Sequence, residues 1–295
     1  MKPMLLLAMP GNESHAMALA AQLPQARAEV LALHRFPDDE VLVTLPDVAD
    51  LDVVLVCSLD HPDALLLPLL FAADAAHELG AARVGLVAPY LCYMRQDMRF
   101  HAGEAVTSRS FARLLSRHVD FLVTVDPHLH RHASLDAIYQ VPAIAVSSAP
   151  AIARWISREV TRPVLVGPDE ESAQWVEAIA ALAQLPHAVL RKIRHDDFHV
   201  EVSLPDAGRW QGHVPVLVDD IVSSAHTLIA AAGSLRQAGL PEPVCVAVHG
   251  LFAGPAFAEL QAAGVAGIVT CNTVAHASNA IDVLPEIADA LTALR

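Results

Sequence analysis

Short apolar runs rich in valine recur along the chain, and longer helix-like stretches separate them. The segment 64–79, for example, is rich in leucine and alanine and is followed by Gly80, a residue type that often ends a helix. Continuous apolar strands between helices are typical of a parallel sheet covered on both faces, so the pattern predicts an α/β fold. The predicted strands are 51–59, 82–90, 119–126, 162–169, 213–220, 243–250 and 266–272.

The two halves of the chain repeat one order of elements. From Val53 the order is strand, turn, helix, glycine and strand, and from Val214 it is strand, acidic turn, helix, glycine and strand. A further apolar helix and a valine-rich strand follow in each half. We therefore expect two similar α/β domains in tandem, residues 1–145 and 146–295, with a boundary in the proline- and serine-containing segment VPAIAVSSAP.

Composition narrows the class of protein. Hydrophobic residues make up 54% of the 295 positions and charged residues 18%, which indicates a globular chain with a large core. The formal charge of −14 argues against a general affinity for nucleic acids or anionic membranes, although a local basic pocket for a small phosphate compound stays compatible with it. No segment has about 18 consecutive clean apolar residues, so we expect no transmembrane helix.

The four cysteines, Cys57, Cys92, Cys245 and Cys271, lie in or beside apolar runs and form no C-x-x-C motif. This spacing favours buried, reduced thiols over disulfides or a zinc site. The apolar run near the N-terminus is too short for the core of a signal peptide. Both observations predict a cytoplasmic protein.

Polar residues at strand ends are the candidate site, because ligands of open α/β sheets bind beyond the carboxyl ends of the strands. Residues 216–228 read VLVDDIVSSAHTL, in which an apolar run ends at Asp219 and Asp220 and small hydroxyl residues precede a helix. Backbone N–H groups at a helix N-terminus form a cradle for phosphate, and adjacent acids can accept hydrogen bonds from vicinal sugar hydroxyls. The stretch therefore predicts a site for a ribose 5-phosphate unit. The alternative is plain helix capping by Ser223 or Ser224 with solvated acids.

This stretch resembles the phosphoribosyl-pyrophosphate (PRPP) loop of type I phosphoribosyltransferases and of ribose-phosphate pyrophosphokinases. Other segments favour the pyrophosphokinases, because they resemble that family's motifs and follow one another in the family's order from about residue 10 to about residue 275. They are RFPDDE (35–40), SLDHP (58–62), APYLCYMRQDMRFHAGEAVTSRSFARLL (88–115), TVDPH (124–128), GPDEES (167–172) and LRKIRHDDFHVEV (190–202).

The resemblance implies two phosphoribosyltransferase-like domains and one reaction. The diphosphoryl group of ATP moves to the 1-hydroxyl of ribose 5-phosphate and gives PRPP and AMP, with Mg2+ as the metal. The resemblance also implies a homo-oligomer, a dimer or a multiple of dimers. The implied ribose-5-phosphate site consists of Asp219, Asp220, Ser223, Ser224, Ala225, His226 and Thr227.

The implied ATP site has two parts. Arg95, Gln96, Asp97 and Arg99 lie along it, and arginine suits phosphate because its fork donates two hydrogen bonds and stays charged. Phe36 stacks on adenine while Asp38 and Glu40 read its polar edge, and in the family these residues come from a neighbouring subunit. Ordinary core packing is the alternative for Phe36.

His128 and Asp169 match the family's magnesium-associated positions. Magnesium prefers oxygen ligands, so His128 is also a candidate hydrogen-bond donor to phosphate. His130 and His132 lie close by in sequence and leave a zinc site at 128, 130 and 132 as an alternative.

Lys192 and Arg194 occupy alternate positions of a polar, hairpin-like segment. Alternate residues of a strand share a face, so both can point at one phosphate group. In the family this loop supplies positive charge to the transition state. An exposed hairpin with scattered charges is the alternative.

The chain departs from the family's motifs at four positions. His226 stands where the family has the glycine of its phosphate loop, and glycine there permits a close backbone approach or a positive φ. Asp39 replaces a glycine, Met98 stands where the family often has a basic residue, and GPDEES has no glycine after its acid. These changes leave two other readings open: a diverged or inactive paralogue that binds nucleotides as a regulatory subunit, and a phosphoribosyltransferase that consumes PRPP.

Overall fold

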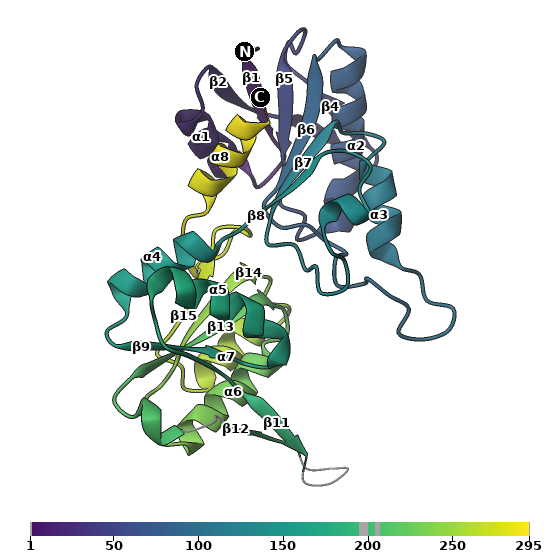
Figure 1. The fold of residues 1–295 in the computed structure, drawn as a ribbon. Coiled ribbons are helices and arrows are strands. Elements are labelled where there is room, and N and C mark those ends of the chain that lie inside the picture. Colours follow the sequence, from purple (N-terminus) through teal and green to yellow (C-terminus); the bar gives the residue numbers. More distant parts are fainter. Residues whose placement is uncertain (1, 195–199, 204–206, 295) are drawn as a thin grey trace. The chain divides into compact units, whose positions relative to one another are not determined.

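The computed structural model describes residues 2–194, 200–203 and 207–294. They form two compact units (Figure 1). Unit 1 contains residues 1–147 and 283–295, and unit 2 contains residues 148–282. Each unit has its own six-stranded sheet.

Unit 1 has a sheet of strand order β2-β1-β5-β6-β7-β8, in which all neighbouring strands are parallel. Helices α1 and α8 lie on one face and α2 and α3 on the other (Figure 1), so that β1, β5 and β7 are buried along their whole length. The strands are β1 (Met4–Ala8), β2 (Ala26–Val30), β5 (Asp52–Val56), β6 (Arg83–Ala88), β7 (Phe121–Val125) and β8 (Ala143–Val146). The helices are α1 (Glu13–Gln22), α2 (Pro62–Glu78), α3 (Thr107–Leu115), α8 (Leu284–Ala293) and the 3-10 helix η1 (Leu135–Ala137).

Unit 2 has a parallel sheet of order β10-β9-β13-β14-β15-β16. Helices α4 and α5 pack together, as do α6 and α7 (Figure 1). The strands are β9 (Pro163–Gly167), β10 (His187–Val189), β13 (Val214–Val222), β14 (Val244–Gly250), β15 (Gly267–Cys271) and β16 (Asn279–Ile281). The helices are α4 (Ala149–Glu159), α5 (Ala173–Ala183), α6 (His226–Gln237), α7 (Ala256–Ala262), η2 (Glu170–Ser172) and η3 (Ala207–Trp210).

Both units follow the same plan. Counted within each unit, the strands of the sheet run in the order 2-1-3-4-5-6. Each unit also inserts a two-stranded antiparallel hairpin between its second and third sheet strands: β3 (Ala32–Arg35) with β4 (Val41–Thr44), and β11 (Arg191–Arg194) with β12 (Val200–Ser203). The predicted α/β fold with two similar domains is therefore confirmed, and it includes the matching strand–helix–strand elements that begin at β5 and β13.

The C-terminal helix belongs to the first unit. The sequence placed all of 146–295 in the second domain, whereas in the structure α8 packs against α1, β7 and β8 of unit 1. Its apolar face, Leu284, Ile287, Ala288 and Leu291, is buried there. This burial is the physical reason for the difference, and contacts so distant along the chain leave no local signal in the sequence.

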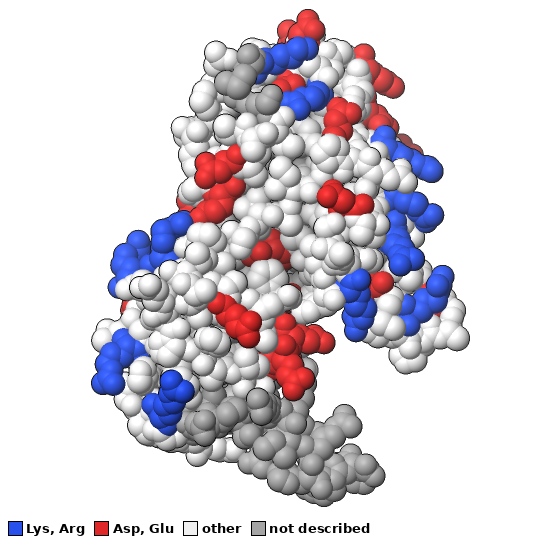
Figure 2. All heavy atoms as spheres, viewed as in Figure 1, with Lys and Arg blue, Asp and Glu red and all other residues white. Residues whose placement is uncertain are grey.

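Acidic and basic side chains are scattered over the face of the molecule shown in Figure 2, and uncharged surface lies between these groups. Within residues 2–194, 200–203 and 207–294, no helix combines the length and hydrophobicity that a bilayer crossing requires.

Replacing Ile287 by alanine tests the packing of α8. Ile287 is fully buried, so Ile287→Ala is expected to lower the free energy of unfolding of unit 1 by about 2–4 kcal/mol. Leu79→Ala is the control, because Leu79 is 55% exposed. All three tryptophans, Trp155, Trp175 and Trp210, belong to unit 2, so hydrogen exchange of unit 1 peptides is the suitable measurement. Equal effects of the two substitutions would contradict the assignment of α8 to the core of unit 1.

Candidate active site

The phosphate-loop candidate lies between β13 and α6 in unit 2, and the segment after β14 holds it in place. The carbonyl of Val222 accepts hydrogen bonds from the amides of Leu251 (2.9 Å) and Phe252 (3.0 Å), and the carbonyl of Ser223 accepts one from Ala253 (2.9 Å). The first amides of α6 have no acceptor within the helix, and the helix dipole adds positive character at this end. The loop therefore leads into a helix N-terminus, the kind of backbone arrangement at which proteins often bind anions.

The left-handed residue of this loop is Ala225, with φ 61° and ψ 0°. The resemblance implies a positive φ at position 226, where the family has glycine. In the structure His226 is instead the first residue of α6 and is exposed, as are Ser224 and Thr227. His226 thus causes no backbone strain, and the strained position carries the smallest side chain that has a Cβ.

The paired acids lie within β13 and not after it. The expected strand ended at Asp220, but β13 continues to Val222. Its pairing with β9 stops at Leu217, whereas its pairing with β14 runs to Val222. Asp219 and Asp220 therefore lie beyond the end of β9, beside the segment that carries Asp169.

Asp169 is held by a capping box at the start of η2. Its Oδ1 accepts hydrogen bonds from the amides of Glu171 (3.1 Å) and Ser172 (3.3 Å), and its own amide faces the Ser172 hydroxyl. Gly167 makes room for this arrangement, because a Cβ there would lie 2.5 Å from the Ser172 oxygen. The acid is thus fixed without the glycine that the family has after it.

These carboxyl groups influence one another. Burial raises the pKa of Asp219 well above its ordinary value, and the charges of Asp220 and Asp169 raise it further. Asp220 is itself buried. A group of three carboxylates that repel one another is stabilised by a cation or by hydroxyl donors. Their oxygen atoms are the ligands that Mg2+ prefers, so the residues of unit 2 fit this metal.

In unit 1, the segment after β6 carries the predicted ATP residues. Arg95, Gln96 and Arg99 are exposed, and Arg99 Nε donates to the carbonyl of Glu104 (2.9 Å). Asp97 differs from them, because its buried carboxylate pairs with Arg131. The four residues therefore do not form one exposed surface.

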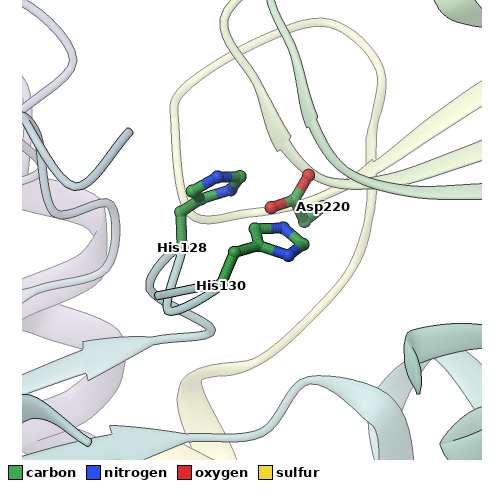
Figure 3. A group of neighbouring side chains, drawn as sticks. All are labelled: His128, His130 and Asp220. Atoms are coloured by element: carbon green, nitrogen blue, oxygen red, sulfur yellow. The ribbon is translucent and has the colours of Figure 1, made fainter. Parts of the chain in front are cut away.

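The loop after β7 carries two histidines whose rings contact each other. The centroids of His128 and His130 lie 4.0 Å apart, and the ring planes are inclined at 61° to each other. Figure 3 draws both imidazoles on this loop and also labels Asp220, which belongs to β13 of unit 2. His132 has a different neighbour, the hydroxyl of Ser108 at 3.5 Å. The two predicted metal positions, His128 and Asp169, lie in different units.

Phe36 begins the turn of the β3–β4 hairpin. Its amide donates to the carbonyl of Glu40 (2.8 Å), and Asp39 adopts the left-handed conformation with φ 69°, which explains the glycine at that position in the family's motif. Phe36 is 41% exposed, and its ring lies nearly perpendicular to that of His34, with 4.7 Å between the centroids. Within unit 1 Phe36 is therefore not a core residue, and Asp38 and Glu40 are exposed beside it.

Lys192 and Arg194 lie on β11, which pairs antiparallel with β12. Lys192 is opposite Val202 and Arg194 is opposite Val200. The connecting residues 195–199 of the predicted loop lie outside the described residues.

Two sets of residues near the candidate site give little or no signal in the sequence. Arg131 binds Asp97, and its only signal was its place three positions after His128. Leu251, Phe252 and Ala253 hold the phosphate loop through backbone amides, which leave no trace in the identity of a side chain.

Two family models match this chain, and together they cover most of its length. Residues 4–118 match the family model described as the N-terminal domain of ribose phosphate pyrophosphokinase, and residues 134–284 match the phosphoribosyl transferase domain. A ribose-phosphate pyrophosphokinase of Methanopyrus kandleri is 34% identical over 260 residues, which cover 87% of this chain and 88% of the relative. One of Halobacterium salinarum (strain R1) is 34% identical over 290 residues, covering 97% and 100%.

A solved structure agrees at the level of the fold. The crystal structure of phosphoribosylpyrophosphate synthetase from Mycobacterium smegmatis has a TM-score of 0.86, with 23% identity and coverage of 99% of both chains. The family models and this solved structure define the class of protein: it consists of two phosphoribosyltransferase-type units in one chain. This chain belongs to the ribose-phosphate pyrophosphokinase family.

Glycine substitutions test the strained position of the phosphate loop. Ala225→Gly removes a Cβ from a left-handed residue, so relief of strain offsets the lost packing and we expect the free energy of unfolding to change by less than about 0.5 kcal/mol. Ala230→Gly, at an exposed position within α6, is expected to lower it by about 1 kcal/mol. Urea denaturation followed by tryptophan fluorescence measures both. A loss at position 225 as large as that at 230 would mean that the left-handed geometry is not maintained in solution.

Proposed function

We propose that this protein transfers the β,γ-diphosphoryl group of ATP to O1 of ribose 5-phosphate and releases PRPP and AMP. The observation that carries the proposal is the loop of unit 2, in which two aspartates on β13 precede a helix N-terminus with an anchored backbone. This combination suits a sugar phosphate, and the names of the relatives from M. kandleri and H. salinarum agree with the assignment.

In unit 2, we assign the 5-phosphate to the backbone amides and hydroxyls of residues 223–227. Asp219 and Asp220 then accept hydrogen bonds from the ribose hydroxyls, which relieves the repulsion between their carboxylates. His226 is exposed at the first helical position, where a ring N–H can donate a hydrogen bond to the phosphate.

The ATP site draws on exposed residues of unit 1. Arg95, Gln96 and Arg99 supply donors for the phosphates, and Phe36 supplies a face for adenine with Asp38 and Glu40 at its polar edge. A ring that is 41% exposed within its own unit is suited to contact from another subunit, so we propose that the active form is a homo-oligomer, a dimer or a multiple of dimers.

The reaction breaks the bond between the α-phosphorus bridge oxygen and the β-phosphorus, while O1 of the sugar forms a new bond to the β-phosphorus. The hydroxyl proton of O1 is lost, and AMP leaves with the bridging oxygen. Such a transfer needs positive charge around the moving group and a fixed in-line geometry. We assign this charge to Lys192 and Arg194 of β11.

Mg2+ is the metal that we expect, with Asp169 and His128 as its associated positions. Asp169 offers carboxylate oxygen, and His128 is better suited to phosphate as a hydrogen-bond donor than to magnesium as a ligand. When bound, the ion neutralises phosphate charge. We place the protein in the cytoplasm, because its four cysteines are buried thiols and burial raises the pKa of Cys57 to about 12.

Incubation with ATP, Mg2+ and ribose 5-phosphate tests the activity. We expect AMP and PRPP in equal amounts, followed by 31P NMR and chromatography, and no AMP when the sugar phosphate is omitted. ATP binding without turnover at high protein concentration would overturn the proposal in favour of a regulatory nucleotide-binding paralogue.

Substitution of the lysines tests the role of Lys192, because the chain contains only two lysines, Lys2 and Lys192. If Lys192 acts on the moving group, Lys192→Ala lowers kcat by roughly 100- to 1,000-fold and weakens ATP binding far less. Lys2→Ala is the matched control and should leave kcat unchanged, since Lys2 is an exposed residue near the N-terminus. Equal losses of kcat and ATP affinity in Lys192→Ala would contradict the assigned role.

A further inference from the structure

An ion pair joins two loops of unit 1 at the carboxyl ends of neighbouring strands. Asp97 follows β6 and Arg131 follows β7, 34 residues later. Arg131 Nη1 donates to both carboxylate oxygens of Asp97, at 3.1 and 3.2 Å. The Asp97 side chain is 0% exposed and that of Arg131 is 45% exposed. Because a buried carboxylate needs a partner, this pair fixes the distance between the loops.

Arg131 makes a second contact on the same segment as Asp97. Its guanidinium carbon lies 5.5 Å from the centroid of the Phe100 ring, within the range of a cation–π interaction. Phe100 is 53% exposed, so this contact restrains a ring that would otherwise be surrounded by solvent. The arginine therefore holds the segment 97–100 at two points.

The loop that carries Arg131 starts from an uncommon backbone conformation. Asp126, the first residue after β7, has φ 34° and is buried. A non-glycine residue in this region costs free energy and persists only where surrounding contacts enforce it. The bond from the Asp126 amide to the Val146 carbonyl (2.9 Å) secures one end of the loop, and the Arg131–Asp97 pair secures the other. His128 and His130 lie between these two anchors.

We propose that Asp97 and Arg131 are positioning residues, and that Asp97 acts on catalysis through Arg131 and not by contact with ATP. The pair sets the position of the His128–His130 loop relative to Arg95, Gln96 and Arg99. The effect on catalysis rests on the proposed diphosphoryl transfer, whereas the restraint on the loop is a property of the protein without substrate.

The first test uses no substrate. Asp97→Asn keeps the size of the side chain but removes its charge, and Arg131→Gln removes the guanidinium. Both should raise the hydrogen-exchange rate of peptides covering 126–132 by roughly tenfold or more, because the loop loses one anchor. Arg117→Gln is the matched control: Arg117 is exposed and lies between α3 and the start of β7, at the opposite end of the strand. Unchanged exchange in both variants would overturn the proposal whether or not the protein is active.

The second test separates positioning from nucleotide contact. Each single variant should lower kcat/KM for ATP by roughly 10- to 100-fold, since small displacements of aligned groups are costly. The double variant should lose no more than the more severe single variant, because both substitutions break one interaction. Multiplied losses in the double variant would mean that Asp97 contacts ATP directly and would overturn the assignment.

Arg131→Lys tests whether a conservative replacement can restore the ion pair with Asp97. One nitrogen of Arg131 contacts both oxygens of Asp97, so a lysine ammonium can keep the pair although it loses the planar contact with Phe100. We expect Arg131→Lys to recover most of the kcat/KM that Arg131→Gln loses, with exchange of 126–132 close to that of the unmodified protein. Failure of this rescue together with normal thermal stability would contradict the pair as the source of the restraint. Absence of turnover in the unmodified protein would refute the proposed function only, because the exchange measurements stand by themselves.

Discussion

The position of β13 between β9 and β14 determines where the chemistry of unit 2 is placed. Parallel pairing with β14 carries the strand to Val222, while β9 ends at Gly167. The last paired residues of β13 therefore place Asp219 and Asp220 beside the segment that carries Asp169, and the chain continues to α6 at the carboxyl edge of the sheet. Because the loop and α6 follow β13 directly, this difference in strand length brings the acids of β13 next to Asp169, immediately before the loop and the N-terminus of the helix.

Several elements could be read from the sequence because their signals are local. The runs 51–59, 119–126 and 243–250 contain β5, β7 and β14, and their continuous burial produces their continuous hydrophobicity. The three-residue strands β10 and β16 lack such a signal, since edge strands are short and partly exposed. The packing of α8 on unit 1 could not be read either, because an amphipathic helix does not specify which sheet it covers.

In the candidate site, too, local features could be predicted from the sequence, whereas contacts between distant residues could not. The loop after β13 was recognisable from its acids and hydroxyl residues, yet the left-handed residue proved to be Ala225 and not the residue at the position of the family's glycine. Asp97 sits in the most distinctive motif of the chain, and only the three-dimensional contact with Arg131 reveals that its carboxylate is occupied by a neighbouring loop. A motif therefore located the chemistry, while the partner of each side chain depended on residues distant in sequence.

The route of the chain has a consequence for synthesis. The polypeptide leaves unit 1 after residue 147 and returns to it at residue 283, so unit 2 is an insertion within unit 1. During translation, all strands of unit 2 emerge before α8 does. Unit 2 can then complete its core on the ribosome while the sheet of unit 1 still exposes the surface that α8 will cover. Chains that terminate early would carry this uncovered apolar surface, which is the feature that chaperones and proteases recognise.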